Sequence, residues 1–282
     1  MKRTGLTRAC VVGWPIEHSR SPRIHGYWLA HYGIEGSYTK EAVPPEGIET
    51  FLLGLSNAGF AGCNATVPHK EAAFRIADER DASAAAVGAA NTLWLEDGRL
   101  CASNTDTYGY MTYLAHKAQD WSRRDAPVAI LGAGGAARAI VHGFLEAGVS
   151  EVRVFNRSAE RAEALAHAFG PRVKAMAWEV RSRAAAESGV LVNTTSVGLE
   201  GAGSLDIDFT GFRADCIVSD IVYVPLETQL IREARARGLR TVDGLGMLLH
   251  QAVPGFEKWF GVRPEVTDEL YDRIAADIEA AR

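Results

Sequence analysis

Short apolar runs alternate with amphipathic stretches through the N-terminal part of the chain. Apolar runs bounded by Gly, Pro and polar clusters are typical of buried strands, and a 3.6-residue apolar period is typical of helices. The pattern predicts strands at 8–13, 37–43 and 61–67, helices at 22–31, 47–55 and 70–78, then a Gly/Ala-rich turn and a hairpin of 91–95 with 99–103. This alternation indicates an α/β layer with a largely parallel sheet.

A second alternation begins after Asp125-Ala-Pro. It predicts strands at 128–131, 151–155, 190–193 and 214–220, helices from the glycine-rich turn to about 147, at 159–169 and at 226–237, and a mostly helical segment from 247 onward. A chain of 282 residues is long enough for two domains. We therefore expect an α/β protein with two domains, a parallel-rich α/β domain followed by a dinucleotide-binding one.

The turn Gly132-Ala133-Gly134-Gly135-Ala136-Ala137 lies directly between a predicted strand and a predicted helix. It approximates G-x-G-x-x-G/A, in which the glycines allow a tight turn and let backbone amides approach a pyrophosphate. The helix N-terminus then supplies N–H groups and a positive dipole for the phosphates. A tight turn without a ligand is the alternative interpretation. The order strand, turn, helix, strand favours a dinucleotide site.

The end of the next strand indicates which dinucleotide binds. NAD-binding proteins usually carry an acidic residue there for the ribose hydroxyls. This chain has Phe155-Asn156-Arg157-Ser158, with Arg161 one helical turn further on. A guanidinium can bind the 2′-phosphate of NADP in a bidentate way, whereas a carboxylate would repel it. Arg157 could instead be a solvated surface residue, but the missing acid still disfavours NAD. We expect NADP as the cofactor.

Polar residues gather at the predicted strand ends of the N-terminal part, where open α/β sheets bind their ligands. Each has a simple structural explanation by itself: Ser21 as a helix N-cap, Lys70 as a solvated lysine, Asn104 and Asp106 as turn residues. Together they predict a polar pocket for a small-molecule substrate. The candidate segments contain Ser19 and Ser21, then Asn64, Thr66 and Lys70, then Asn91 and Thr92, and finally Asn104 and Asp106.

The composition of the chain argues against several classes of function. The formal net charge is −5, with 30 basic against 35 acidic residues and no block of like charge, which argues against binding to nucleic acid or an anionic membrane surface. No apolar run is long enough for a signal peptide or a membrane span. The four cysteines form no C-x-x-C pair, and the eight histidines show no metal-binding spacing. We expect a cytoplasmic protein without a metal site.

Nine motifs stand in order from Gly13 to Ala252, within a resemblance that extends to Trp259, and resemble those of the shikimate dehydrogenases: GWPIEHSRSPRIH, NATVPHK, GAANTL, NTDTYG, GAGGAARA, NRS, NTTSVGL, DIVYVPLET and DGLGMLLHQA. The resemblance implies NADP-dependent, reversible reduction of 3-dehydroshikimate to shikimate in aromatic amino-acid biosynthesis. It also implies an N-terminal substrate domain, a Rossmann-type NADP domain at 107–243, and a C-terminal segment that returns to the first. The substrate domain then comprises 1–106 plus 244–282. A homodimer is the one protein assembly we consider.

The resemblance also implies roles for individual residues. Ser19 and Ser21 match the pair that binds the substrate carboxylate, and Lys70 matches the catalytic lysine, with Asp106 orienting it. The residues matching those that hold the ring hydroxyls are Thr66, Asn91, Asp106 and Gln251, with Tyr223 nearby. The expected cofactor residues are Gly132, Ala133, Gly134, Gly135, Ala136, Asn156, Arg157, Ser158, Arg161, Ile221 and Gly244.

Three alternatives stay open on the sequence. A quinate/shikimate dehydrogenase with broader substrate or cofactor use is the nearest, and Arg157 together with the serine pair disfavours it. A methylenetetrahydrofolate dehydrogenase does not fit the ordered substrate motifs. A non-catalytic NADP-binding regulator would be expected to lack Lys70 or Asp106, and both are present.

Overall fold

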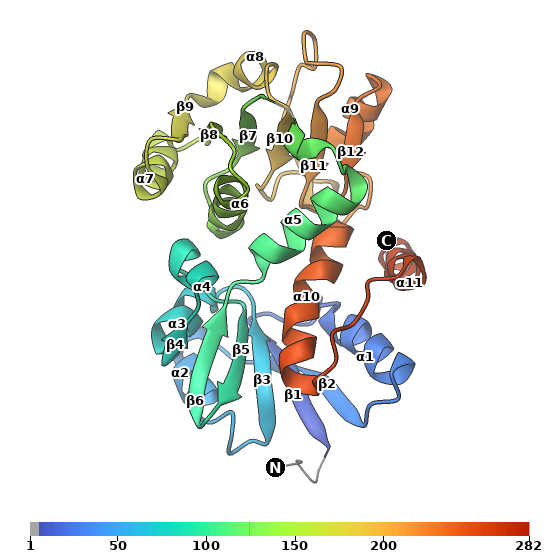
Figure 1. Cartoon of the computed structure of the whole chain (residues 1–282). Coiled ribbons are helices and arrows are strands. Elements are labelled where there is room, and N and C mark those ends of the chain that lie inside the picture. The colour runs from blue at the N-terminus through green and yellow to red at the C-terminus, as the bar shows by residue number, and fades with distance from the viewer. Residues whose placement is uncertain (1–5, 124, 282) are drawn as a thin grey trace. The chain divides into compact units, whose positions relative to one another are not determined.

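The computed structural model of the chain describes residues 6–123 and 125–281 (Figure 1). The chain folds into two compact units. The first comprises the chain up to Asp106 together with Leu249–Ile274, and the second comprises Thr107–Leu248 together with the residues from Ala275 on. The break after Asp106 coincides with the predicted domain boundary. The predicted return at 244 lies five residues before the observed one, and the last residues join the second unit rather than the first.

The first unit contains a six-stranded mixed sheet in the order β2-β1-β3-β5-β6-β4 (Figure 1). Strand β1 pairs in parallel with β2 and β3, whereas β5 is antiparallel to both β3 and β6, and β4 is parallel to β6. The strands are β1 Thr7–Gly13, β2 Gly36–Ala42, β3 Phe60–Ala65, β4 Glu79–Arg80, β5 Thr92–Glu96 and β6 Arg99–Ser103. The helices are α1 Ser21–His31, α2 Ile48–Leu53, α3 Lys70–Ile76 and α4 Ala82–Val87, together with those parts of α10 Leu245–Phe260 and α11 Asp268–Ala280 that fall within Leu249–Ile274.

Side-chain alternation along β1 gives this sheet two different faces. Cys10 and Val12 point into a core with Cys63 and Ala65 of β3, which is covered by α2, α3 and α4. Ala9 and Val11 point to the other face, where they pack with Tyr38 and with Trp259 of α10. Both faces are therefore buried, and the polar residues of interest sit where the strands end.

The second unit contains a six-stranded sheet in the order β12-β11-β10-β7-β8-β9, in which every pairing is parallel. The order reverses direction between β7 and β10, which is the switch point where doubly wound folds bind dinucleotides. The strands are β7 Val128–Leu131, β8 Val152–Phe155, β9 Val173–Met176, β10 Val190–Asn193, β11 Ile217–Asp220 and β12 Arg240–Val242. The helices are α5 Asp106–Lys117, α6 Gly135–Glu146, α7 Ala159–Phe169, α8 Arg181–Ala185 and α9 Gln229–Ala236.

The predicted α/β class with a doubly wound second sheet is confirmed, and several local predictions need correction. The Gly/Ala-rich turn contains α4, which Asp81 caps through its side chain. Residues 214–216 precede β11 rather than belonging to it, and the helix predicted from 226 begins at Gln229 because Thr228 caps it. Helix α5 and the short strands β4, β9 and β12 were not expected. Their sequences carry little periodic signal.

None of the described helices is long and apolar enough to cross a membrane.

Candidate active site

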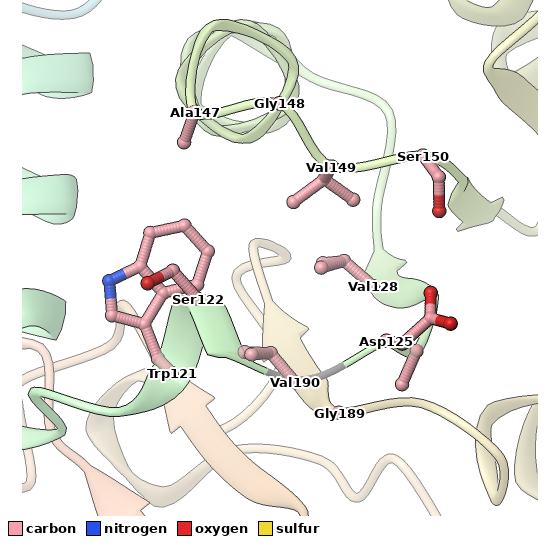
Figure 2. A pocket seen from close by; sticks show the side chains of 11 residues that line it. Trp121, Ser122, Asp125, Val128, Ala147, Gly148, Val149, Ser150, Gly189 and Val190 are labelled. Carbon is pink, nitrogen blue, oxygen red and sulfur yellow. The ribbon is translucent and has the colours of Figure 1, made fainter.

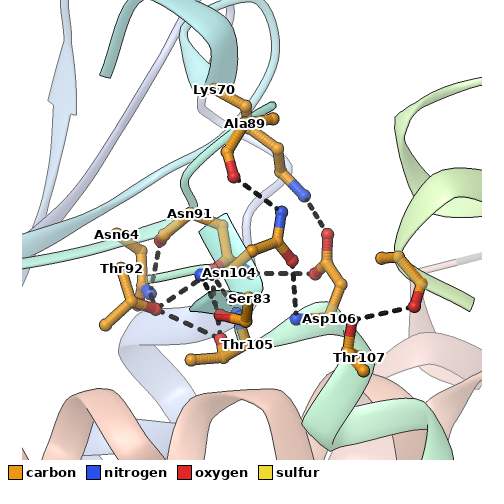
Figure 3. A network of polar contacts seen from close by, with 11 residues as sticks. Asn64, Lys70, Ser83, Ala89, Asn91, Thr92, Asn104, Thr105, Asp106 and Thr107 are labelled. Carbon is orange, nitrogen blue, oxygen red and sulfur yellow. Dashed lines mark hydrogen bonds and ion pairs between the residues drawn. The ribbon is translucent and has the colours of Figure 1, made fainter. Parts of the chain in front are cut away.

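Lys70 and Asp106 form the centre of the polar cluster that the first unit builds (Figure 3). Lys70 is the first residue of α3 and Asp106 the first of α5, so both stand at element ends next to the sheet. The Lys70 Nζ lies 2.6 Å from Asp106 Oδ2. The lysine side chain is 31% exposed and the aspartate 10%. Lys70 is therefore held in place by an ion pair while its side chain stays partly exposed.

Asn91 also holds this pair in place, through Asp106. Its Nδ2 donates to Asp106 Oδ1 at 2.8 Å, so both carboxylate oxygens of Asp106 are engaged. The Asn91 Oδ1 accepts from the Thr105 backbone N–H at 2.8 Å, and the Asp106 N–H donates to Asn104 Oδ1 at 3.1 Å. Asn104 does shape the turn before α5, as its structural interpretation predicted. Lys70 is more than a solvated lysine and Asp106 more than a turn residue, because the two side chains form an ion pair with each other.

Ser19 and Ser21 lie at the start of α1. Ser21 was interpreted as an N-cap, and this is wrong: Arg20 occupies the N-cap position and Ser21 is the first helical residue. The Ser21 N–H points to Ser19 Oγ at 3.4 Å. The side chain of Arg20, at the N-cap position, makes no capping hydrogen bond. Two hydroxyls beside a helix N-terminus form a suitable environment for a carboxylate.

The other candidate substrate residues, Thr66, Gln251 and Tyr223, lie at three separate elements. Thr66 follows β3 and is half-buried, with its methyl group packed against the backbone of Gly13. Gln251 lies half-buried on α10 within the first unit. Tyr223 belongs to the second unit, where it follows β11. The structure therefore brings Lys70 and Asn91 each into direct contact with Asp106, and it places Ser19 and Ser21 together at a separate element of the same unit.

The glycine-rich turn fits the pyrophosphate of a dinucleotide. Gly132 has a φ of 108° and packs against Thr194, so a side chain there would be strained and would clash. Gly134 and Gly135 are exposed, and a Cβ on either would meet nothing within 4 Å. In the described part of the chain no side chain caps α6. Its first N–H groups are therefore open to phosphate oxygens.

The end of β8 presents the residues expected to distinguish NADP from NAD. Arg157 and Arg161 are exposed, and Asn156 and Ser158 are half-buried. Asn156 Nδ2 donates to the Ser158 carbonyl at 2.9 Å, which braces the turn into α7. The Arg157 guanidinium lies over the Trp178 ring, 5.9 Å from its centre. The first carboxylate after the strand, Glu160, accepts from the Ser158 hydroxyl at 3.2 Å.

A buried carboxylate organises the neighbouring strand ends. Asp220 Oδ1 accepts from Asn193 Nδ2 at 2.8 Å, and Asp220 Oδ2 accepts from the Thr228 hydroxyl at 2.7 Å. Burial raises the pKa of Asp220 to about 6, although these hydrogen bonds act to lower it. A Cβ at Gly244 would lie 2.3 Å from the Ile221 carbonyl oxygen. The backbones of Ile221 and Gly244 can thus approach each other only because residue 244 is a glycine.

One pocket of the second unit lies away from these residues. It encloses about 310 Å³ and is lined by Trp121, Asp125, Val128 and Val190, among others (Figure 2). Val128 and Val190 are the first residues of β7 and β10. The pocket is therefore at the amino ends of the parallel strands, whereas the glycine-rich turn follows the carboxyl end of β7.

Comparisons with known proteins agree with this geometry. Family models match residues 11–93 (shikimate dehydrogenase substrate binding domain), 113–199 (shikimate / quinate 5-dehydrogenase) and 244–268 (shikimate 5′-dehydrogenase C-terminal domain). A protein named shikimate dehydrogenase (NADP(+)) from Rhodopseudomonas palustris is 54% identical over 272 residues, which cover 96% of this chain and 95% of that protein. The chain belongs to the shikimate dehydrogenase family.

Solved structures extend the comparison. Shikimate 5-dehydrogenase from Thermus thermophilus, in complex with NADP(H) and shikimate, has a TM-score of 0.86 and 37% identity, covering 97% of this chain and 100% of that one. Quinate dehydrogenase from Corynebacterium glutamicum, in complex with NAD, has a TM-score of 0.87 and 28% identity, covering 96% and 99%. The predicted family is confirmed, and with it an oxidoreductase that uses NADP.

Sequence reasoning missed three polar or aromatic residues that support the site of this shikimate dehydrogenase family member: Tyr38, Trp178 and Asp220. Asp220 ends a fully buried strand, and a carboxylate at such a position is a recognisable signal. Tyr38 lies in an ordinary strand, and Trp178 reaches Arg157 only through strand pairing. Neither has a local sequence pattern that marks it.

Proposed function

We propose that this protein reduces 3-dehydroshikimate to shikimate with NADPH, and oxidises shikimate in reverse, within aromatic amino-acid biosynthesis. The observation that carries the chemistry is the Lys70–Asp106–Asn91 arrangement, in which a lysine is fixed by a carboxylate that is itself fixed by an amide. NADPH, when bound, supplies the hydride. The chain's own residues must supply orientation and a proton.

Reduction of the ketone places the hydride on the carbonyl carbon and requires a proton on the carbonyl oxygen. The Lys70 ammonium is the proposed donor of this proton, and in the reverse direction the neutral amine accepts it. Asp106 holds the Lys70 amino group at 2.6 Å, and we propose that it also shares the hydrogen-bond network of the reacting hydroxyl. Because the lysine side chain is 31% exposed, its proton can be replaced from solvent after each turnover.

Binding is divided between chemically different elements. The hydroxyls of Ser19 and Ser21 and the N-terminus of α1 are proposed to hold the substrate carboxylate. Thr66, Asn91, Asp106, Tyr223 and Gln251 are the proposed partners of the ring hydroxyls. The turn from Gly132 to Ala136 and the N-terminus of α6 are proposed to bind the pyrophosphate, with Ile221 and Gly244 also on the cofactor. Asn156, Arg157, Ser158 and Arg161 are proposed to bind the adenosine 2′-phosphate.

Initial rates with four substrate–cofactor pairs test this function. Absorbance at 340 nm is followed with shikimate or quinate, each with NADP⁺ or NAD⁺. We expect shikimate with NADP⁺ to give the highest kcat/KM. A higher value for quinate, or an equal one with NAD⁺, would support the broader quinate/shikimate activity instead. No turnover with any pair would support a non-catalytic binding role.

The cytoplasmic location and the homodimer stay predictions. Light scattering coupled to size exclusion measures the mass in solution, for which a dimer of the 30.4 kDa chain gives twice that value.

A further inference from the structure

Three buried polar residues, Tyr38, Asn64 and Thr92, lie behind the residues proposed to bind the substrate. Their exposed fractions are 8%, 6% and 1%. We call them the buried polar chain. A buried polar side chain destabilises a fold unless its hydrogen-bonding groups are satisfied. Each of these three is hydrogen-bonded, and together their bonds connect segments that are far apart in sequence.

The sheet register brings Tyr38 and Asn64 to one face. Tyr38 pairs with Ala9 of β1, and Asn64 pairs with Val11 of the same strand. Tyr38 packs with Ala9 and Val11 on the face covered by Trp259. Asn64 stands between Cys63 and Ala65, which both point to the opposite core, so its side chain points to the face of Tyr38. Ala9, lying beside Tyr38, is small enough to leave room for this contact.

The hydrogen bonds of Asn64 set the orientation of its amide. The Tyr38 hydroxyl donates to Asn64 Oδ1 at 2.6 Å. The Asn64 Nδ2 must then point the other way, and it donates to the Asn91 carbonyl at 2.9 Å and to Thr92 Oγ1 at 3.0 Å (Figure 3). Burial raises the pKa of Tyr38, so its hydroxyl stays a donor throughout the working pH range.

Thr92 connects the Asn64 amide to Asn91, and Asn91 contacts the Lys70–Asp106 pair. Since its oxygen accepts from Asn64, its single proton is free to reach Asn91 Oδ1, which lies 3.1 Å away. Asn91 Oδ1 thereby faces Thr92 and Thr105, and its Nδ2 is left to face Asp106. The series of hydrogen bonds ends at Lys70, which Asp106 holds (Figure 3). No atom of Tyr38 or Asn64 touches Lys70 or Asp106 directly by any of these bonds.

The opposite end of the buried polar chain reaches α1. The Ser21 side chain acts to lower the pKa of the Tyr38 phenol against the effect of burial, as a hydroxyl next to the phenol oxygen does. The His25 ring stacks on the Tyr38 ring with centres 3.9 Å apart and planes 9° from parallel. His25 is fully buried, which lowers its pKa to about 3, so it stays a neutral packing partner. Tyr38 therefore fixes the first turn of α1 through two residues.

We propose that Tyr38, Asn64 and Thr92 are positioning residues that align the two ends of the substrate site, Ser21 at one end and the Asp106–Lys70 pair at the other. The proposal rests on the function proposed above. It predicts that removing one hydroxyl from this chain changes how the substrate is held or processed, although neither Tyr38 nor Thr92 needs to touch it.

Substitutions that remove a hydroxyl and keep the side-chain shape test the proposal. Thr92→Val should lower kcat for shikimate oxidation about 3- to 10-fold, in keeping with the loss of one or two hydrogen bonds, and leave KM for NADP⁺ unchanged. Thr92→Ser keeps the hydroxyl and should restore most of kcat. Tyr38→Phe should mainly raise KM for shikimate, by about 3- to 10-fold, because it releases the Ser21 end.

Matched controls separate positioning from stability. Thr39→Val removes a hydroxyl that contacts Glu41, and Tyr27→Phe removes one that lies near Thr267, so both should leave kcat and KM unchanged. The melting temperature of each variant is measured beside its kinetics. If Thr92→Val does not fold, Tyr38→Phe decides the question. In kcat/KM the double variant should lose less than the product of the two single losses, since Tyr38 and Thr92 both hydrogen-bond to the Asn64 amide.

Two results would overturn the inference. One is wild-type kcat and KM in both folded variants, with only the melting temperature lowered. The other is a failure of Thr92→Ser to recover activity. Failure of the proposed function is a separate result, because wild-type protein would then show no shikimate turnover at all.

Discussion

The proposed substrate residues of the first unit and the proposed cofactor residues of the second are held in opposite ways. As whole residues, Asn91 and Asp106 are 3% and 7% exposed, and protein groups already occupy most of their hydrogen-bonding capacity. Gly134, Gly135 and Arg157 are exposed, and the α6 N-terminus has no side-chain cap within the described residues. Proton transfer to one defined oxygen atom requires fixed geometry, which buried hydrogen bonds supply. Binding of phosphates requires accessible donors and charge, which open loops supply.

The largest expected effect on activity is at the substrate residues of the first unit. Lys70→Ala should lower kcat by about 10²- to 10⁴-fold, because it removes the proposed proton donor, and should change KM little. Steady-state rates at 340 nm with shikimate and NADP⁺ measure this. Lys258→Ala is a matched control, since that lysine is exposed and lies over the Trp94 ring. A near-normal kcat in Lys70→Ala would remove Lys70 from the chemistry.

Asp220 is the exception within the second unit, because it is a buried carboxylate at a strand end. Its pKa is raised by burial from 3.8 to about 6, so the folded protein holds this proton where the unfolded chain has lost it. This group's contribution to stability is full below pH 4 and is lost as pH rises to 6. Integrated over that window, the free energy of unfolding falls by about 3 kcal/mol.

Urea unfolding at pH 4 to 7 measures this contribution. Asp220→Asn should lack the fall, so the variant gains relative to wild type as pH rises. Asp208→Asn serves as the control, because the pKa of that exposed carboxylate is lowered by its bonds to Thr210 and its effect lies below pH 4. Parallel curves for Asp220→Asn and wild type would show that the pKa of Asp220 is the same in the folded and unfolded states.

A substitution of Arg157 tests the exposed cofactor residues of the second unit. Arg157→Ala should raise KM for NADP⁺ by about 10- to 100-fold, as expected for the loss of charge-assisted hydrogen bonds to a phosphate, without changing KM for NAD⁺. Arg157→Lys should recover only part of this effect because an ammonium cannot bind in a bidentate way. Arg183→Ala, at another exposed arginine of the second unit, is the control. Equal losses with both cofactors would mean that Arg157 does not contact the 2′-phosphate.

Substitutions of Trp178 have the smallest expected effect. They test whether the contact with the Trp178 ring helps to position Arg157. Arg181 lies over the same ring at 4.7 Å and is itself anchored to three backbone carbonyls, so Trp178 is held in place. Trp178→Leu should raise KM for NADP⁺ about 2- to 5-fold by releasing Arg157, and Trp178→Phe should raise it less. An unchanged KM in Trp178→Leu would leave Arg157 positioned by its own backbone alone.

Local patterns were sufficient for much of the fold. The glycine-rich turn between β7 and α6 was predicted because close packing and a positive φ at Gly132 restrict that position to one residue type. Helix α5 was not, because Gly109 and its several aromatic and β-branched residues give it low helix propensity. Its helical state depends on burial, as in the edge-on packing of Tyr110 against Phe144.

The sequence by itself determined the α/β class, the dinucleotide turn and its preference for NADP, because these depend on residues adjacent along the chain. Through motif resemblance it also identified the family and the residues that stand at the candidate site. Only the tertiary structure decided which of those residues meet. The pairing of Tyr38 with Asn64 follows from β2 and β3 flanking the same strand, and the contact of Arg157 with Trp178 follows from the register of β8 and β9. Such contacts join segments distant in sequence, and no local periodicity encodes them.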